Sequence, residues 1–410
     1  MKKFGLFLGV FIFTAQLLFA QNINEEKLYN DIAYLSSDKL KGRRTGTKEE
    51  LKAAKYIAKQ FKELGLQPKG TVGYLYPFAF KHNPNPHDTA TAKLPTETGH
   101  DVLGFLDNGA AKTIVIGAHY DHLGLGHDHN SLDPNPDGKI HNGADDNASG
   151  TAGVLALANY FAKNIYKENY NILFMCFSGE ELGLFGSKKW CDNPTVPLSS
   201  INFMLNMDMI GRLNDTNNKL MIYGVGTAPT WVPLLDELNT NFSIKKDSAG
   251  IGPSDQTAFY LKDIPVLHFF TGQHSDYHKP SDDIEKINIK GEKRVLDFII
   301  KLMENLDKKP PLIFQKTQTP TSAKSAFKVT LGIMPDYTFE GKGVRVDGTT
   351  DGKPAANAGL LVGDVVRKLG AIDVNSMEDY MKALGKFEKG QTTTVEVERN
   401  GQRLTKSITF

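Results

Sequence analysis

The sequence contains little cysteine and no long apolar run beyond its first twenty residues. Its 410 residues include two cysteines, Cys176 and Cys191, which excludes a fold held together by several disulfide bonds. A single bridge between them stays open, because Cys176 lies in an apolar run that would equally well bury a free thiol. After Ala20 no apolar segment is long enough to cross a bilayer, so we expect no membrane association once the leader described below is removed.

The chain also lacks a net charge of either sign. Its 48 basic and 47 acidic residues almost balance, which gives no indication of nucleic acid or of an anionic membrane as a partner. A hydrophobic content of 40% and a charged content of 23% are typical of a soluble globular protein. A chain of this length can form two or three domains, and we find no internal repeat.

The first twenty residues differ in composition from the rest. Lys2 and Lys3 precede the uncharged apolar stretch "FGLFLGVFIFTAQLLFA", which ends in the small residue Ala20. This layout is typical of a secretory signal peptide over residues 1–20, cleaved before Gln21. The sequence therefore predicts an exported protein, periplasmic or secreted, and an uncleaved membrane anchor is the alternative.

Four short apolar runs, separated by long polar segments, indicate buried strands. The runs are "TIVIGAH" at 113–119, "NILFMCFS" at 171–178, "FMLNMDMIG" at 203–211 and "IPVLHFF" at 264–270. Because none of them alternates, both faces of each strand should be buried. Helical segments lie around them, and the second one along the chain has Thr47 as its predicted N-cap and Gly65 at its end. This rhythm predicts an α/β fold in which helices cover a sheet.

A change of composition divides the chain after this α/β segment. Residues 308–325 carry prolines, lysines and threonines with little periodicity, which is typical of a linker. We therefore assign residues 21–307 to one domain and residues 326–410 to a second, small and β-rich domain. In the second domain Asn400 and Gly401 lie between alternating segments, which predicts a type I′ hairpin.

Carboxylate and imidazole side chains gather at the ends of the predicted strands. In an open α/β sheet these ends share one edge, where ligands bind. Acids and imidazoles crowded there would repel and desolvate one another unless a metal neutralised them. This mixture of ligands is expected for zinc, and two ions could share one carboxylate. The residues concerned are His119, Asp121, Asp145, Asp146, Glu180, Glu181, Asp208 and His278.

Each of these motifs has a simpler explanation when it is taken alone. Asp146 could cap a helix, and the pair Glu180 and Glu181 could lie in a solvated turn. Their joint occurrence at strand ends favours the metal site.

Five ordered segments resemble the motifs of the co-catalytic zinc aminopeptidases, peptidase family twenty-eight. They are "GAHYDHLG", "HNGADDNASGTAGV", "FSGEELGLFGS", "NMDMIGR" and "DYHKPSDD", and the resemblance extends over about residues 25–305. It implies a mixed, largely parallel sheet flanked by helices, with two zinc ions per catalytic domain. His119 and Asp208 would hold one ion, and Glu181 and His278 the other. Asp146 would bridge the two.

The same resemblance implies roles for the residues around the ions. Glu180 would be the general base, and Asp121 would orient His119. Tyr277 would bind the oxyanion of the tetrahedral intermediate, although a core tyrosine is the alternative. Asp282 is a candidate for orienting His278.

Other parts of the motifs carry weaker expectations. The peptide bond after Asp146 would be cis. The segment "SDQTAF" resembles a substrate pocket, with Gln256 in place of a commoner histidine. A surface loop explains the remaining histidines of the region, to which we assign no ligand role; these are His122, His127, His129 and His141.

The C-terminal domain resembles a bacterial PDZ domain. The segment "TLGIMP", around Gly332, is similar to its carboxylate-binding loop, and "PAANAGLLVGDVVRKLGAIDV" is similar to its most characteristic stretch. Such a domain would bind a peptide or protein C-terminus as an added strand. A domain that packs on the catalytic unit and binds nothing is the alternative.

Together these features predict an exported zinc aminopeptidase that hydrolyses N-terminal residues from peptides with a metal-activated water. Two alternatives stay open. One is a carboxypeptidase or glutaminyl cyclase on the same scaffold, and the other is a non-catalytic protein that binds peptides through its PDZ domain. The sequence does not reveal the preferred residue at the cleaved position, the occupancy of the two metal sites, the oligomeric state or the PDZ ligand.

Overall fold

The structure is a computed structural model, and it describes residues 22–82, 94–128, 130–317, 329–335, 339, 341–349 and 352–410. The proposed signal peptide, His129 and residues 318–325 of the predicted linker lie outside the described residues. Within these ranges no helix is long and apolar enough to span a membrane.

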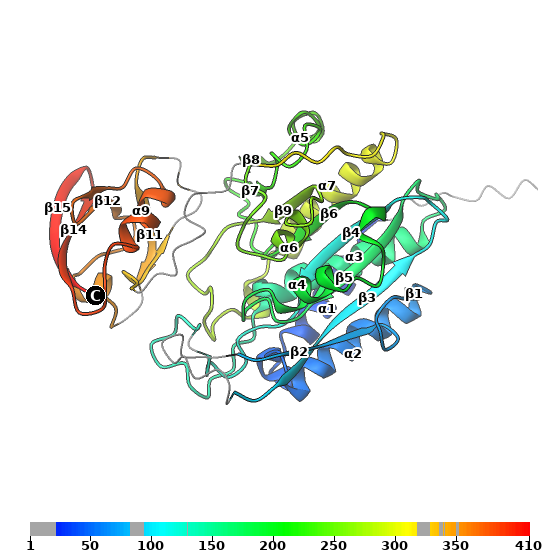
Figure 1. Ribbon diagram of the computed structural model, residues 1–410, viewed down its shortest axis with the longest axis horizontal. Coiled ribbons are helices and arrows are strands. Elements are labelled where there is room, and N and C mark those ends of the chain that lie inside the picture. Colours follow the sequence, from blue (N-terminus) through cyan, green and yellow to red (C-terminus); the bar gives the residue numbers. More distant parts are fainter. Residues whose placement is uncertain are drawn as a thin grey trace, which may run out of the picture.

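A mixed β-sheet forms the centre of the N-terminal unit (Figure 1). In the described part of the chain the strand order is β1-β3-β5-β4-β6-β9-β7-β8, and β2 pairs with β3. The four middle strands β5, β4, β6 and β9 run parallel, while β3 and β7 join them antiparallel. The strands are β1 Gln67–Pro68, β2 Leu75–Phe80, β3 Glu97–Leu106, β4 Thr113–His119, β5 Asn171–Phe177, β6 Ile201–Met207, β7 Lys219–Tyr223, β8 Ser243–Asp247 and β9 Val266–Phe270. The predicted fold class, a mixed and largely parallel sheet flanked by helices, is confirmed.

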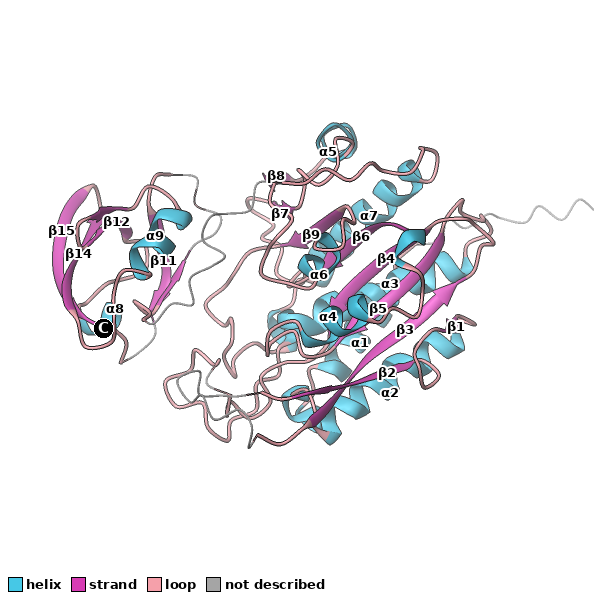
Figure 2. Ribbon diagram, viewed as in Figure 1, coloured by secondary structure: helices cyan, strands magenta, loops and turns pink. Residues whose placement is uncertain are grey.

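Helices cover both faces of this sheet (Figure 2). Side chains of α1, α2, α3, α5 and α7 share one apolar cluster with the sheet, and side chains of α4 and α6 share a second. Neighbouring residues of β4 enter different clusters: Ile114 and Ile116 belong to the first and Val115 to the second. The helices are α1 Glu25–Leu35, α2 Lys48–Glu63, α3 Gly150–Lys163, α4 Phe185–Asp192, α5 Trp231–Leu238, α6 Gln256–Tyr260 and α7 Ile289–Leu306. Burial on both sides explains why the middle strands are continuously apolar.

Helix α2 begins and ends as the sequence predicts, and the two cysteines do not pair. The Thr47 hydroxyl accepts a hydrogen bond from the Glu50 N–H at 3.1 Å, so Thr47 is the N-cap, and Gly65 has a φ of +74° just beyond the helix. Cys176 and Cys191 are both free and buried. They belong to clusters on opposite faces of the sheet, so the open alternative of a disulfide bond is not realised.

The C-terminal unit has its own sheet and its own core (Figure 1). Asn400 and Gly401 have φ values of +50° and +78° in the turn between β14 and β15, as the predicted type I′ hairpin requires. Val366, Val395 and Val397 are fully buried at its centre. The elements are β10 Ile333–Pro335, β11 Val344–Thr349, α8 Pro354–Asn357, β12 Val365–Leu369, β13 Ile372–Asp373, α9 Met377–Leu384, β14 Thr392–Arg399 and β15 Gln402–Thr409. The predicted domain boundaries at 307/308 and 325/326 stay predictions.

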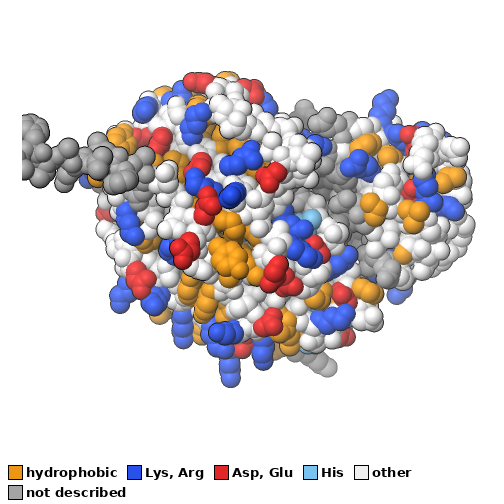
Figure 3. Space-filling model, turned by 180° about the vertical axis from the view of Figure 1, so that it is seen from behind, with side chains coloured by type: hydrophobic (Ala, Val, Ile, Leu, Met, Phe, Trp, Pro, Cys, Tyr) orange, Lys and Arg blue, Asp and Glu red, His pale blue; other side chains and the backbone are white. Residues whose placement is uncertain are grey.

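Charged side chains of both signs alternate over the surface seen from behind (Figure 3). This mixture matches the balanced charge of the sequence.

Candidate metal centre

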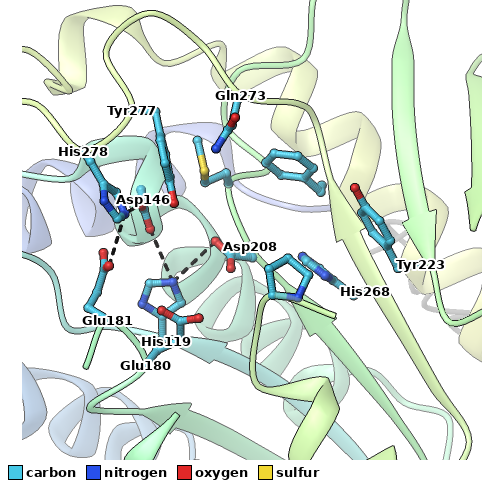
Figure 4. A pocket seen from close by; sticks show the side chains of 13 residues that line it. His119, Asp146, Glu180, Glu181, Asp208, Tyr223, His268, Gln273, Tyr277 and His278 are labelled. Atoms are coloured by element: carbon cyan, nitrogen blue, oxygen red, sulfur yellow. Dashed lines mark ion pairs between the residues drawn. The ribbon is translucent and has the colours of Figure 1, made fainter. Parts of the chain in front are cut away.

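The carboxyl ends of the parallel strands bring the predicted site residues together (Figure 4). His119 is the last residue of β4, and Asp208 directly follows the last residue of β6. Glu180 and Glu181 lie in the turn after β5, and His278 lies in the loop after β9. Parallel strands end at one edge of the sheet, so four segments distant in sequence place their polar side chains in one pocket.

Asp146 occupies the centre of this group. Its Oδ1 lies 3.4 Å from Nε2 of His119, and its Oδ2 lies 3.2 Å from Nε2 of His278. A further carboxylate approaches the same Nε2 atom of each imidazole. Oδ1 of Asp208 lies 3.4 Å from Nε2 of His119, and Oε2 of Glu181 lies 3.1 Å from Nε2 of His278. The result is two imidazole–carboxylate groups that share one aspartate.

The segment that carries Asp146 is held by buried partners. Its peptide bond to Asn147 is cis, as the resemblance implied. The backbone N–H groups of Asp145 and Asp146 both donate to Oδ2 of Asp282 at 3.0 Å. The expectation that Asp282 orients His278 is wrong, because Nδ1 of His278 contacts the carbonyl oxygen of Asn130 at 2.7 Å. Asp282 instead positions the backbone at Asp146.

Asp121 lies beside His119, but it acts mainly on the backbone. Nδ1 of His119 is 3.2 Å from the carbonyl oxygen of Asp121 and 3.6 Å from its carboxylate, so the carbonyl is the closer partner. The carboxylate accepts hydrogen bonds from the Thr45 hydroxyl at 2.8 Å and from the Glu180 N–H at 3.2 Å. It therefore connects the end of β4 to the turn that carries Glu180.

The electrostatics of the pocket reflect crowding of like charges. Burial raises the pKa of Glu180 well above its usual range, and the carboxylates of Glu181 and Asp208 add to the rise, against an opposing effect of His119. Burial alone would raise the pKa of Asp146, but hydrogen bonds from His119 and His278 hold that pKa well below its usual range. The Asp146 side chain is buried, so its carboxylate stays ionised only because positive charge lies next to it.

Three features of the pocket were not predicted or were predicted differently. His122, to which no role was assigned, lies with Nδ1 2.7 Å from Oε1 of Glu181. Arg43 is fully buried and donates to the carbonyl oxygens of Tyr120, Gly143 and Asp146. Gln256 does not line the pocket. Its Oε1 accepts a hydrogen bond from the buried Asn206, and Pro253 from the same region lines the pocket instead. A lone arginine or histidine in a polar segment gives no signal by which sequence reasoning could have assigned such contacts.

The other histidines of the region stay apart from the cluster. Nε2 of His141 contacts the Ser131 hydroxyl at 2.7 Å, and the side chain of His127 is 60% exposed.

Tyr277 packs its ring on that of His278, with 3.9 Å between the ring centroids. Figure 4 shows the hydroxyl end of Tyr277 directed towards the centre of the cluster.

The pocket has a volume of about 580 Å³ including its mouth. Beyond the ionisable cluster it extends past Asp208 to an arm formed by apolar, aromatic and amide side chains (Figure 4). The residues of this arm are Met209, Tyr223, Pro253, His268, Phe270 and Gln273. A volume of this size accommodates a small organic ligand beside the carboxylates.

Within the described residues, two groups of side chains bring their ligand atoms close enough together to hold a metal ion each. One comprises His119, Glu180 and Asp208, and the other comprises His122, Asp146 and Glu181. In each group the ligand atoms lie within 4.8 Å of one another.

Several known proteins are similar to this chain in sequence. Leucine aminopeptidase 2 of Arthroderma otae is 28% identical over 204 residues, which are 42% of this chain and 39% of the relative. Aminopeptidase YwaD of Bacillus subtilis is 28% identical over 201 residues, 45% of this chain and 43% of the relative. A probable zinc metalloprotease of Pyrenophora teres is 33% identical over 131 residues, 32% of this chain and 26% of the relative. The chain thus spans less than half of the length of these relatives.

Solved structures share the fold at low sequence identity. An aminopeptidase from Aneurinibacillus has a TM-score of 0.53 and 19% identity, with 72% of this chain and 97% of that chain covered. A zinc-dependent exopeptidase from Parabacteroides distasonis and a glutaminyl cyclase from Bacteroides thetaiotaomicron each have a TM-score of 0.56 and 18% identity, with 70% of this chain and 99% of theirs covered.

Family models assign both parts of the chain. The model described as peptidase family M28 matches residues 101–303, and the model described as PDZ domain matches residues 319–410. The first range contains all of the residues that line the ionisable cluster. The second begins seven residues before the predicted start of the C-terminal domain at 326. The chain therefore contains a domain of peptidase family M28, followed by a C-terminal PDZ domain.

Proposed function

We propose that this protein is a zinc-dependent aminopeptidase that removes N-terminal residues from peptides, and that it is exported to the periplasm or the exterior. Membership of family M28 and relatives named as aminopeptidases support the activity. The observation that carries the proposal is the single carboxylate of Asp146 between two imidazoles, each with a further carboxylate. The composition of residues 1–20 supports export.

The separations between these side chains fit zinc better than they fit direct ion pairs. Zinc lies about 2.0–2.1 Å from nitrogen and oxygen ligands, so two ligands of a tetrahedral ion are separated by roughly 3.3 Å. The four imidazole–carboxylate separations are 3.1–3.4 Å. A charge-assisted hydrogen bond would be shorter, about 2.7–2.9 Å. Oδ1 of Asp208 is also buried without a hydrogen-bond partner among the described residues, as expected of an atom that faces an ion.

The donor set therefore suits two ions per catalytic domain. His119 and Asp208 would hold one, Glu181 and His278 would hold the other, and Asp146 would contribute one oxygen to each. Zinc bound there supplies Lewis acidity, which lowers the pKa of a water molecule and polarises the scissile carbonyl.

The surrounding side chains would carry the proton transfers and the orientation of the peptide. Glu180 accepts the proton of the attacking water and then donates it to the leaving amine. The Asp121 carboxylate holds the backbone N–H of Glu180 and keeps this side chain at the pocket. Tyr277 donates its hydroxyl to the oxyanion of the tetrahedral intermediate. Glu180 and Asp208 bind the free α-amine, which restricts cleavage to the N-terminus.

The test compares free and blocked peptides with the purified full-length chain. We expect hydrolysis of free-amine peptides, loss of activity on N-acetylated ones, and two zinc ions per chain by elemental analysis. Glu180→Gln should lower kcat by about 10²–10⁴-fold with unchanged zinc content, because it removes the general base and leaves the proposed metal ligands in place. Equal rates on blocked peptides would argue for another hydrolase, and ammonia release from N-terminal glutamine without chain shortening would argue for a cyclase. Wild-type activity of the Glu180→Gln protein would remove Glu180 as the base.

The PDZ domain is proposed to bind a peptide or protein C-terminus. Its family membership supports this role, since PDZ domains add an extended peptide to a sheet edge. Calorimetry with a random C-terminal peptide library and its C-terminally amidated counterpart tests it. No binding that depends on the free carboxylate would favour a domain with a purely structural role.

A further inference from the structure

His122 lies against the metal centre without belonging to the ligand set described above. The side chain is fully buried, and its Nδ1 is 2.7 Å from Oε1 of Glu181. Its ring meets the ring of His278 edge to face, with 5.8 Å between centroids. Gly143 leaves room for this ring, since a Cβ at Gly143 would lie 2.4 Å from Cδ2 of His122. The packing on three sides fixes the imidazole against one oxygen of Glu181.

The contact between His122 and Glu181 is shorter than the contacts between the imidazoles and carboxylates of the proposed metal ligands. The four imidazole–carboxylate separations at the metal positions are 3.1–3.4 Å, close to the edge of a zinc tetrahedron. The separation of 2.7 Å between His122 and Glu181 is a charge-assisted hydrogen bond instead. Oδ2 of Asp146, which belongs to another carboxylate, is 3.9 Å from Nδ1 of His122 and is too far for a second bond.

The second ring nitrogen decides which nitrogen carries the proton. Nε2 of His122 is buried and has no hydrogen-bond partner among the described residues. A proton on Nε2 would be a buried donor without an acceptor, which is costly. The neutral ring therefore carries its proton on Nδ1 and donates it to Oε1 of Glu181. That leaves Oε2, which faces His278 at 3.1 Å, as the oxygen that is free for a metal ion.

We propose that His122 is a positioning residue for Glu181: its Nδ1–H holds Oε1, so that Glu181 presents Oε2 alone to the metal position shared with His278 and Asp146. His119 ends β4 and His122 lies three residues further along the chain, so one short segment supplies a ligand to one metal position and a hydrogen bond to the ligand of the other. The inference rests on the proposed zinc site. It concerns metal affinity, and its test does not depend on any peptidase activity.

The experiment measures zinc binding by the metal-free full-length protein in competition with a chromophoric chelator. The variants are His122→Leu, which removes the hydrogen bond, and His122→Asn, whose amide can donate in place of Nδ1. The exposed His127, five residues along the same loop, gives the matched control His127→Asn. Far-ultraviolet circular dichroism checks that each variant is folded.

We expect His122→Leu to weaken one of two zinc-binding steps by about 10–100-fold, the usual effect of losing a hydrogen bond to a metal ligand. The other step should change less than threefold, and His122→Asn and His127→Asn should remain near wild type. The absorption spectrum of bound Co²⁺ should be the same in wild type and His122→Asn. Unchanged binding by His122→Leu would overturn the proposal. Equal losses in both His122 variants with an altered Co²⁺ spectrum would overturn it too, because His122 would then be a ligand.

A separate observation concerns the arm of the pocket beyond Asp208. His268, on β9, is 2% exposed and lines this arm, and neither of its ring nitrogens has a hydrogen-bond partner among the described residues. Its ring stacks on that of Tyr223 at 5.3 Å, which holds it in place. Oε1 of Gln273, also in the lining, is buried and without a partner as well. Buried polar groups without a partner are unfavourable until a ligand forms hydrogen bonds with them.

The chemistry of His268 defines what such a ligand must offer. Burial lowers the pKa of His268 to about 4, so the ring is neutral at pH 7 with one donor and one acceptor nitrogen. Met209, Phe270 and Pro253 make the rest of the arm apolar. We infer that this arm binds an uncharged side chain with an apolar stem and a terminal carboxamide, so that N-terminal glutamine or asparagine is preferred over leucine. This inference rests on the proposed function and names its substrate class.

Matched tripeptides that differ only in the N-terminal residue test the preference, with free amino acid and ammonia both measured. We expect kcat/KM for glutamine to exceed that for leucine at least tenfold. His268→Leu should lower this ratio at least tenfold, and His268→Gln, which keeps a donor and an acceptor, should lower it less. A leucine preference in wild type, or a ratio unchanged in His268→Leu, would overturn the inference and leave the aminopeptidase intact. Ammonia release without free glutamine would support the pocket assignment and refute the aminopeptidase activity.

Discussion

Arg43 offers a sharp test of how the metal centre is held together. Its guanidinium is 0% exposed and donates to the carbonyl oxygens of Leu35 at 3.1 Å, Tyr120 at 2.5 Å and Gly143 at 2.7 Å, and to that of Asn142. Tyr120 directly follows the predicted zinc ligand of β4, and Gly143 lies three residues before the predicted bridging aspartate. One side chain therefore ties together the two loops that meet at the centre.

The expected effect of Arg43→Met follows from these contacts. Methionine fills part of the volume but donates no hydrogen bond, so the carbonyl oxygens lose a buried partner. A buried polar group left unpaired costs about 1–3 kcal/mol, and disruption of a buried charged group about 3–5 kcal/mol in all. We expect a loss of about 3–5 kcal/mol. At roughly 2–4 °C per kcal/mol in a domain of this size, the Tm should fall by about 6–20 °C.

The neighbouring Arg44 provides the matched control. Its side chain is 19% exposed, and its ion pairs join Glu97 and Asp128. Arg44→Met should therefore cost only about 1 kcal/mol. Calorimetry of both variants, with saturating zinc and with a chelator, checks the difference. The reasoning is refuted if Arg43→Met destabilises the protein no more than Arg44→Met, or if it leaves zinc affinity unchanged.

Three further predictions concern pH, metal and the C-terminal domain. Glu292 is fully buried near Asp145, and burial raises its pKa well above the usual range, so stability should fall as pH rises from about 4.3 through that raised pKa. Glu292→Gln should then raise the Tm at pH 8 and change it little at pH 4, and equal shifts at both pH values would contradict this. Removal of zinc should lower the Tm, since ligand at a thousandfold excess over Kd adds about 4 kcal/mol; an unchanged Tm after verified removal would count against the site. Gly401→Val should destabilise the PDZ domain by about 1–3 kcal/mol, because Gly401 has a φ of +78°, and an unaltered transition of that domain would disprove the turn argument.

The sequence predicted the middle of the sheet and missed its edges. The runs that became β4, β5, β6 and β9 are apolar throughout because helices cover both of their faces. Strand β2 is apolar with alternating burial and contains Pro77, β3 mixes polar and apolar residues, and β8 is at least partly exposed along its whole length. No single periodicity marks such strands, because their pairing depends on neighbours that are distant in sequence.

The sequence by itself determined the fold class, the hairpin at Asn400 and the set of residues that we propose for the metal centre. Each of these depends on a local pattern: an apolar run, a turn dipeptide, or ligand types at strand ends. Only the tertiary structure decided which partner each residue contacts. It turned Asp282 towards the backbone of Asp146, placed His122 on Glu181 and buried Arg43 among carbonyl oxygens. These contacts join loops that are far apart in the chain, so their geometry exists only once the sheet has aligned its strand ends.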